Sequence, residues 1–319
     1  MTGTDDASSM KTAFLFPGQG SQQVGMGKSL FETAPAAGEV FEQADRALGF
    51  SLSKLCFEGP DEDLRLTANT QPAILAVSTA ALRAFEARGA RADFVAGHSL
   101  GEYSALVAAG SMKFADAIRA VRRRGEFMQE AVPAGEGAMA ALIGISIESV
   151  QALCEEVSSF GVCAPANINS PSQTVIAGKA LAVERAVKLA QARGAKRAVM
   201  LAVSAPFHCG LMKPAAERLA SVLNEIEFGD LDIPLVTNVD AKLTTSGSEA
   251  HDALLRQVAS PVRWSESVRL LIDKGVRRFV EIGPGKVLSG LVRQISRDCQ
   301  TLNVEDAQSL DAAAASLEL

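Results

Sequence analysis

One serine stands in a setting that restricts how the chain around it can fold. A short apolar run, residues 93–97, leads into Gly97-His98-Ser99-Leu100-Gly101, and a helical pattern follows at 103–109. Glycines at this spacing let the backbone turn sharply between a strand and a helix, so that the serine hydroxyl projects alone. The same pattern occurs by chance in ordinary glycine-rich turns. The strand and the helix on either side favour a nucleophilic Ser99.

Strands and helices alternate through most of the remaining chain. The apolar runs and helical periods predict strands at 12–16, 93–97, 233–238 and 278–282, and helices at 31–48, 71–88, 103–109, 114–132, 211–223 and 250–258. The first strand ends at Pro17-Gly18-Gln19-Gly20, which is typical of a tight loop after a buried strand. This alternation predicts a large α/β domain.

The segment 137–204 has a different order of elements. It shows strand patterns at 139–145, 162–169, 173–177 and 198–203, with helical patterns at 146–157 and 180–193 between them. The resulting order, βαββαβ, is that of the ferredoxin-like fold. Gly135 and Gly137, which follow Pro133, indicate a domain boundary. We therefore predict a small ferredoxin-like domain at 135–204, inserted into a large discontinuous domain formed by residues 1–134 and 205–319.

Composition and charge exclude several classes of protein. Of the 319 residues, 48% are hydrophobic and 21% are charged, as in ordinary soluble globular proteins. The 31 basic residues against 37 acidic ones give a net charge of −6, which argues against nucleic-acid binding. No stretch approaches the roughly 18 consecutive apolar residues of a membrane span, and residues 1–10 do not have the pattern of a signal peptide. We expect a cytoplasmic protein with no membrane partner.

The cysteines and the glycine-rich stretches predict neither a metal site nor a nucleotide site. The five cysteines form no CxxC pair and are scattered, which suits free thiols in a reducing compartment. The glycines at 18–25 and at 283–290 do not follow the spacing of a dinucleotide-binding motif or a P-loop. We therefore expect no metal and no redox or nucleotide cofactor.

A serine nucleophile needs a base, and the chain has three histidines. Side chains of adjacent residues diverge in so tight a turn, so we expect His98 to pack behind it. His251 stands in a polar stretch that opens a helix, where a solvated surface residue is expected. His208 follows the apolar run 198–203 and precedes a helix, where strand-end loops present catalytic groups. It is the favoured base, and a buried, hydrogen-bonded core histidine is the alternative.

The predicted helix 114–132 carries three consecutive arginines beside an apolar stripe. Arg122 and Arg123 fall off the stripe and are expected in solvent, whereas Arg124 lies at its margin and can point inward. A buried guanidinium without a partner is costly, so Arg124 needs a carboxylate, either from this chain or from a substrate. A charged hydrogen bond contributes about 1.5–3 kcal/mol, which corresponds to roughly a 10- to 100-fold preference for a dicarboxylic acyl group over acetyl.

Seven short motifs follow one another along the chain between residue 14 and about residue 295. They are PGQGSQ at 17–22, NTQPA at 69–73, GHSLGEYSA at 97–105, RG with FMQ at 124–129, PFH at 206–208, Gln257 with Pro261-Val262, and GPGK at 283–286. In kind and order they resemble the malonyl-CoA:acyl carrier protein transacylases of fatty acid synthesis, which are related to the acyltransferase domains of polyketide synthases.

This resemblance implies a fold and an activity. The fold is an α/β-hydrolase-like large domain with a parallel sheet, interrupted by a ferredoxin-like small domain, with the active site in the cleft between them. The activity is transfer of malonyl from malonyl-CoA to the phosphopantetheine thiol of acyl carrier protein, by a ping-pong mechanism that needs no cofactor. A hydrolase with the same serine and histidine, and an inactive scaffold that binds carrier proteins, are the alternatives. We expect a monomer that serves fatty acid or polyketide synthesis.

The resemblance also implies roles for residues of the catalytic centre. Ser99 is the acylated nucleophile and His208 is the general base. The backbone N–H groups of Gln19 and Leu100 form the oxyanion hole. Gln257 takes the place of the acid in a hydrolase, and its amide region orients His208.

Two further residues are implied to select the acyl group. Arg124 is similar to the arginine that binds the malonyl carboxylate in this family. Phe207 stands where many bacterial transacylases have serine, and we expect its ring to crowd an α-methyl branch. Acyl carrier proteins are generally acidic, so a basic patch near the cleft is expected. Its candidate residues are Arg193, Lys196, Arg197 and Lys286.

Overall fold

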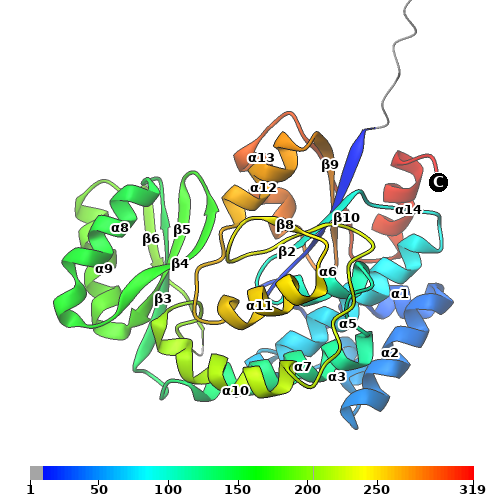
Figure 1. Cartoon of the computed structure of the whole chain (residues 1–319), viewed down its shortest axis with the longest axis horizontal. Coiled ribbons are helices and arrows are strands. Elements are labelled where there is room, and N and C mark those ends of the chain that lie inside the picture. Colours follow the sequence, from blue (N-terminus) through cyan, green and yellow to red (C-terminus); the bar gives the residue numbers. More distant parts are fainter. Residues whose placement is uncertain (1–9, 204) are drawn as a thin grey trace, which may run out of the picture.

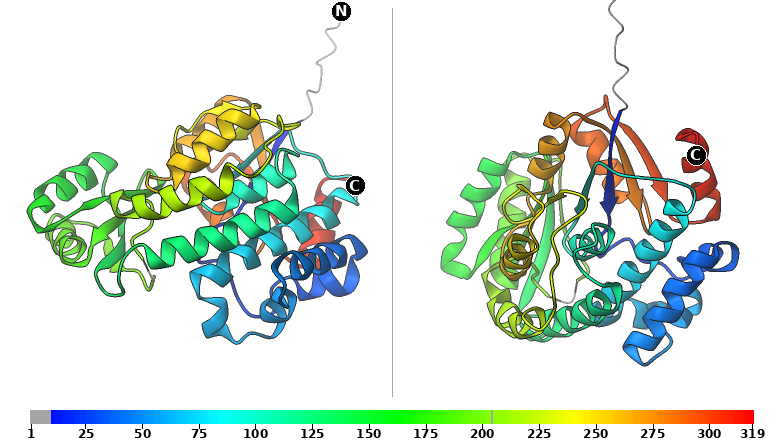
Figure 2. Two further views of the ribbon diagram at one scale, coloured as in Figure 1. Left: turned by 60° about the horizontal axis from the view of Figure 1, so that its bottom comes forward. Right: turned by 45° about the vertical axis from the view of Figure 1, so that its right-hand side comes forward.

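The computed structural model describes residues 10–203 and 205–319, and it contains two β-sheets. Figure 1 shows the four-stranded sheet and its helices as a lobe at the left, beside the larger part of the molecule that surrounds the six-stranded sheet. In the left view of Figure 2 the same lobe again forms one end of the molecule. One sheet is largely parallel and the other is antiparallel, which confirms the predicted mixed α/β class.

The six-stranded sheet places the loops that follow residues 16 and 97 at the same edge. Its order is β10-β9-β1-β2-β7-β8, and neighbouring strands are parallel except β7 and β8. The strands are β1 Lys11–Phe16, β2 Phe94–Gly97, β7 Leu235–Val236, β8 Leu243–Thr244, β9 Val276–Ile282 and β10 Gln300–Val304. Phe16 pairs with Gly97, so β1 and β2 end together. The carboxyl edge of a parallel sheet is where α/β proteins place their ligand sites.

Helices cover both faces of this sheet. Phe14 and Phe16 of β1 belong to one hydrophobic core, and Ala13 and Leu15 point to a second core on the opposite face. The helices on the first side include α5 Thr67–Glu86, α6 Gly101–Ala108 and α7 Phe114–Glu130, and those on the second side are α12 Trp264–Asp273 and α13 Val287–Ile295. Burial on both faces explains why the strands read as continuous apolar runs.

The remaining helices of the larger part differ in places from the prediction. They are α1 Lys28–Thr33, α2 Pro35–Leu48, α3 Leu52–Glu58, α4 Asp61–Leu64, α10 Lys213–Leu223, α11 Gly247–Gln257 and α14 Ala307–Ser316, with a 3₁₀ turn at Gly210–Met212. The single helix predicted at 31–48 is two helices, because Pro35 starts α2 after an extended Ala34. Along residues 10–203 and 205–319, no helix combines the length and apolar character that a membrane crossing requires.

The four-stranded sheet follows the predicted βαββαβ order. Its elements are β3 Gly137–Ile143, α8 Ile147–Glu156, a 3₁₀ turn Ser158–Phe160, β4 Cys163–Ser170, β5 Gln173–Lys179, α9 Ala180–Ala192 and β6 Arg197–Met200. The strands pair antiparallel in the order β4-β5-β3-β6. Leu142 and Ile176 pack beneath α8 and α9, whereas Met139 and Val175 face the core of the larger part. The domain limits at 135 and 204 stay a prediction, and Ser204 lies outside the described residues.

A backbone contact ties the four-stranded sheet to the larger part. Asn167 of β4 and Val262, which precedes α12, form a parallel bridge. The Ile168 N–H donates to the Val262 carbonyl at 2.9 Å, and the Val262 N–H donates to the Ala166 carbonyl at 2.8 Å. The edge strand of the smaller sheet is therefore anchored to the segment that follows α11.

Candidate active site

Ser99 lies in the turn between β2 and α6, where the glycine spacing predicts it. Its backbone is left-handed, with φ 53°, a conformation that costs energy for any residue except glycine. A Cβ atom on Gly97 would lie 1.9 Å from the carbonyl of Gly101, and one on Gly101 would lie 2.0 Å from the carbonyl oxygen of Phe16. Any side chain at either glycine would therefore push the turn apart.

Asn238, which follows β7, supports this turn from the neighbouring strand. Its Oδ1 accepts a hydrogen bond from the Ser99 N–H at 2.7 Å, and its Nδ2 donates to the Gly97 carbonyl at 2.6 Å. The side chain is almost completely buried. Asn238 was not predicted as a site residue, and its only signal in the sequence is a polar residue at the end of an apolar run.

His208 is hydrogen-bonded to the Ser99 hydroxyl. Its Nε2 lies 2.6 Å from Ser99 Oγ, and its Nδ1 lies 3.0 Å from the backbone carbonyl oxygen of Gln257. Because a carbonyl oxygen only accepts, Nδ1 carries the proton and Nε2 is free to accept one. Burial, together with the positive charge of Arg124, lowers the pKa of His208 to about 3. The imidazole is therefore neutral near pH 7, the state that a general base requires.

Gln257 holds His208 with its main chain and not with its side-chain amide. The amide makes other contacts, since its Nε2 donates to the Ser99 carbonyl at 3.0 Å and to Glu102 Oε2 at 2.7 Å. Its Oε1 accepts from Arg124 Nη2 at 2.9 Å. The amide region was implied to orient His208, and the structure assigns this contact to the backbone carbonyl of the residue.

Arg124 points inward, as its position on the predicted helix indicates, and it is 1% exposed. Its Nη2 donates to Ser99 Oγ at 3.1 Å, and its Nη1 donates to Gln71 Oε1 at 2.8 Å. Within the described part of the chain it makes no ion pair, so no Asp or Glu neutralises it by direct contact. Burial lowers the pKa of the guanidinium, and the nearby Tyr103 and Glu102 act in the opposite direction. A buried cation with neutral hydrogen-bond partners is suited to receive a substrate carboxylate.

The two arginines before Arg124 differ from each other. Arg123 is exposed, as expected. The prediction of a solvated Arg122 is wrong, because its side chain is half-buried and donates to the Ala68 carbonyl at 3.0 Å. The helix α5 begins at residue 67 and not at 71, so Pro72 lies inside it. Proline has no N–H group and cannot donate to the carbonyl of Ala68, four residues earlier. Arg122 supplies the donor that Pro72 lacks.

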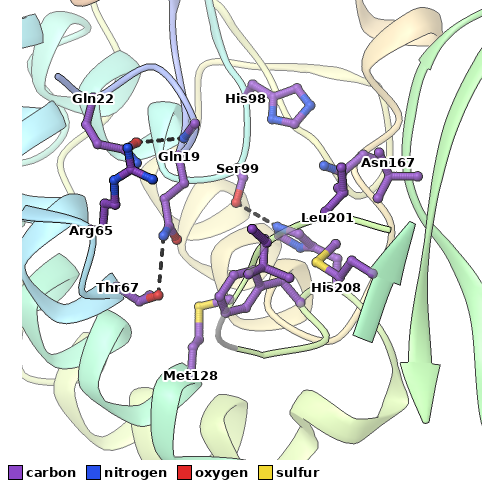
Figure 3. Close-up of a pocket in the computed structure, with 16 residues that line it drawn as sticks. Gln19, Gln22, Arg65, Thr67, His98, Ser99, Met128, Asn167, Leu201 and His208 are labelled. Atoms are coloured by element: carbon purple, nitrogen blue, oxygen red, sulfur yellow. Dashed lines mark hydrogen bonds between the residues drawn. The ribbon is translucent and has the colours of Figure 1, made fainter. Parts of the chain in front are cut away.

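A cavity of about 350 Å³ opens onto the Ser99 hydroxyl, and both sheets contribute to its wall (Figure 3). Its lining from the larger part is Gln19, Gly20, Gln22, Arg65, Thr67, His98, Ser99, Met128, Phe207 and His208, and that from the smaller sheet and the segment after it is Met139, Asn167, Val175, Leu201, Ala202 and Val203. Among the described residues, Arg124 and Gln257 are not part of this wall and contact Ser99 from the protein interior. The structure thus brings the nucleophile and base candidates and Phe207 to one cavity.

Two backbone N–H groups near Ser99 are free to donate. Neither the Leu100 N–H nor the Gln19 N–H has a hydrogen-bond partner among the described residues. Leu100 precedes the first turn of α6, where helix geometry leaves N–H groups without internal partners. The side chain of Gln19 is held in the cavity by hydrogen bonds to Thr67 Oγ1 at 3.4 Å and from Gln71 Nε2 at 3.3 Å, the first of which Figure 3 shows.

The other two histidines do not lie where the sequence predicts them. His98 was expected behind the turn, but it lines the cavity, because Asn169 Oδ1 of β4 holds its Nε2 at 2.8 Å and the Trp264 ring packs against it. The prediction of a solvated His251 is also wrong, since its ring is half-buried edge-on against Phe228 at 5.0 Å between ring centres.

Two of the thiols lie close together, since Cys163 Sγ donates to Cys154 Sγ at 3.7 Å. Across residues 10–203 and 205–319, no group of three or more His, Cys, Asp or Glu side chains is arranged to hold a metal ion. All five cysteines are free thiols. Cys209, the neighbour of His208, is buried, and its Sγ donates to the Pro206 carbonyl.

Comparison with known proteins places this arrangement in a family. The family model of the acyl transferase domain matches residues 13–313. The malonyl CoA-acyl carrier protein transacylase of Bacillus subtilis (strain 168) is 52% identical, over 97% of this chain and 98% of that protein. The crystal structure of an acyl-carrier-protein S-malonyltransferase from Bartonella henselae matches with a TM-score of 0.94 and 47% identity, over 97% of this chain and 100% of that one. A malonyl-transacylase in complex with its type II PKS acyl-carrier protein matches with a TM-score of 0.93 and 48% identity, over 96% and 99%. The chain belongs to the acyl transferase domain family and is an acyltransferase.

Proposed function

We propose that the chain transfers a malonyl group from malonyl-CoA to the phosphopantetheine thiol of an acyl carrier protein, through an ester on Ser99. The observation that carries this proposal is a pair of contacts at one oxygen atom. His208 Nε2 lies 2.6 Å from Ser99 Oγ, and Arg124 Nη2 lies 3.1 Å from it. A base makes the hydroxyl nucleophilic, and a fixed cation favours an acyl group with a free carboxylate. The relatives are named malonyl transacylases, and one is in complex with its carrier protein.

The first half-reaction forms the ester. His208 Nε2 takes the Ser99 proton as Oγ attacks the thioester carbon, and the Gln19 and Leu100 N–H groups donate to the developing oxyanion. The carbon–sulfur bond then breaks, and coenzyme A leaves with the proton that His208 returns. The backbone carbonyl of Gln257 keeps the imidazole in the required tautomer throughout.

The second half-reaction transfers the acyl group. The carrier's thiol gives its proton to His208 and attacks the ester, and Ser99 Oγ leaves and recovers the proton. A neutral carbonyl partner makes His208 less basic than a carboxylate partner would, which suits a thiol acceptor better than water. No metal or redox cofactor takes part in these steps.

Arg124 and Phe207 select the acyl group in this proposal. The free carboxylate of a malonyl ester lies one methylene beyond the ester carbonyl, within reach of a guanidinium that already contacts Oγ. The Phe207 ring lies in the cavity wall and would crowd an α-methyl branch.

The proposal extends to the carrier surface and to the architecture. Arg193 and Lys286 each pair with a glutamate, whereas Lys196 and Arg197 are exposed at the start of β6 and make no ion pair among the described residues. These two are the favoured contacts for an acidic carrier protein.

We further propose a cytoplasmic monomer, with an α/β-hydrolase-like domain formed by 1–134 and 205–319 and a ferredoxin-like domain at 135–204.

Labelling with malonyl-CoA tests this function. The protein mixed with malonyl-labelled coenzyme A thioester alone is expected to retain about one label per chain, and holo acyl carrier protein is expected to discharge it. Ser99→Ala should lower labelling by at least about 1,000-fold, since nothing replaces the nucleophile. Rapid release of free malonate without a carrier would indicate a hydrolase, and no ester in the wild-type protein would contradict acyl transfer altogether.

A further inference from the structure

Glu102 is a buried carboxylate that the steps above do not use. It stands in the first turn of α6, three residues after Ser99, and is fully buried. Its Oε2 accepts from Gln257 Nε2 at 2.7 Å and from the Asn238 N–H at 3.2 Å. Its Oε1 has no partner among the described residues. Burying a carboxylate costs free energy, so the presence of Glu102 at this position calls for an explanation.

The side-chain amide of Gln257 stands between Glu102 and Arg124. Its Oε1 accepts from Arg124 Nη2 at 2.9 Å, while its Nε2 donates to Glu102 Oε2 at 2.7 Å. A guanidinium only donates, and a carboxylate only accepts. The amide therefore satisfies both neighbours in only one of its two orientations. In the other orientation its NH₂ group would face the guanidinium and its oxygen would face the carboxylate.

We infer that Glu102 is a positioning residue, which holds the Gln257 amide with its oxygen toward Arg124 and so keeps the guanidinium aimed at the acyl group on Ser99. The inference rests on the proposed function, because it adds the support behind the carboxylate-binding Arg124. Glu102 itself touches neither the Ser99 hydroxyl nor the wall of the cavity within the described part of the chain.

This role does not require a negative charge at residue 102. Burial raises the pKa of Glu102 to about 7, against the opposing effects of Gln257, Asn238 and Arg124. In the protonated acid the hydrogen can occupy Oε1, so that Oε2 still accepts from Gln257. A glutamine at residue 102 offers the same carbonyl acceptor, whereas a leucine offers none. Glu102→Gln and Glu102→Leu therefore separate hydrogen bonding from packing.

The test compares two acyl donors in single-turnover experiments. We would measure the rate constants of malonyl-Ser99 and acetyl-Ser99 formation from the two coenzyme A thioesters. Glu102→Leu is expected to lower the malonyl-to-acetyl ratio about 10- to 100-fold, the value of a charged hydrogen bond that loses its alignment. Glu102→Gln is expected to keep the ratio within about threefold of wild type, because its carbonyl preserves the amide orientation.

Glu281 provides a matched control. It is also fully buried, and it accepts two backbone hydrogen bonds, from Leu288 at 3.0 Å and Ser289 at 2.7 Å, at the N-terminus of α13. Glu281→Gln and Glu281→Leu should leave the ratio unchanged. If Glu102→Leu does not fold, Glu102→Met tests the same contact with an unbranched side chain of similar length, which also offers no carbonyl acceptor.

The outcomes separate this inference from the proposed function. An unchanged ratio in folded Glu102→Leu, or equal losses with both donors, would overturn the positioning role, since equal losses indicate damage to the turn alone. A wild-type protein that forms acetyl-Ser99 but no malonyl-Ser99 would overturn the proposed function. Normal malonyl-Ser99 formation in the wild type, with a lowered ratio in Glu102→Leu and recovery in Glu102→Gln, supports both.

Discussion

The two walls of the cavity are built differently. On the side of the six-stranded sheet, Ser99 and His208 line the cavity, and Arg124 contacts Ser99 from the protein interior behind them, so that His208 Nε2 and Arg124 Nη2 both bond to Ser99 Oγ. On the side of the four-stranded sheet, Met139 and Val175 present apolar surface, beside the polar side chain of Asn167. Polar groups in a buried network depend on one another, whereas apolar side chains are exchangeable if volume is kept. We therefore expect the first wall to determine the chemistry and the second wall to determine the shape of the cavity.

Removal of Arg124, which supports the polar wall from the protein interior, should have the largest effect. Arg124→Ala is expected to lower kcat/KM for malonyl-CoA about 10- to 100-fold relative to acetyl-CoA, because the free carboxylate loses its charged partner. Steady-state kinetics with both donors measure this change. Arg123→Ala, at the exposed neighbouring position, is the control. Equal losses with the two donors would show that Arg124 serves the structure and not selection.

Removal of Asn238 should have the next largest effect. Asn238→Ala leaves the Ser99 N–H and the Gly97 carbonyl without their partners, which should cost about 1–3 kcal/mol in the free energy of unfolding. The rate of ester formation should fall equally for both donors, because the turn and not the guanidinium is disturbed. Urea unfolding and single-turnover labelling measure the two effects, with the exposed Asn224→Ala as control. Unchanged stability would argue against Asn238 as the support of the turn.

His208 should make the stability of the folded protein sensitive to acid. Its folded pKa of about 3 lies below the usual histidine value, so between roughly pH 6.5 and 3 the unfolded chain binds the proton that the folded one excludes. Stability therefore falls as the pH falls through this window. His208→Asn should flatten the dependence by up to about 1.4 kcal/mol per pH unit. Urea unfolding at pH 7 and 5.5 tests this, and equal slopes in both proteins would contradict a neutral buried His208.

The apolar wall should give the smallest functional effect. Val175→Ala removes two buried methyl groups and should cost about 1–2 kcal/mol of stability. The malonyl-to-acetyl ratio of ester formation should stay at the wild-type value, since no polar partner is lost. A shift in that ratio as large as that of Arg124→Ala would remove the distinction between the two walls.

Local patterns were sufficient to predict the main elements and the nucleophile. The glycines around Ser99, the inward position of Arg124 and the βαββαβ order depend on neighbours close in sequence. The helices α12, α13 and α14, the short β8 and the half-exposed β10 were not predicted. The two residues of β8 show no period, and mixed exposure weakens the period of β10.

The partners of the site residues could not be predicted in the same way. Every residue carries a carbonyl, so nothing in the sequence marks the one of Gln257 that holds His208. Asn238 lies 139 positions from Ser99, and Gln71 lies 53 positions from Arg124. These pairs meet only through the packing of the sheet and its helices. The sequence motifs that contain these residues do not indicate which contact each side chain makes.

The bridge between Asn167 and Val262 has a mechanical consequence. Val262 lies five residues after Gln257, whose carbonyl fixes the imidazole, and it is pinned to the edge strand β4 of the smaller lobe. An outward rotation of that lobe would displace the segment 257–262, whose first residue holds the His208 ring. The position of the base is therefore mechanically coupled to the smaller lobe through β4.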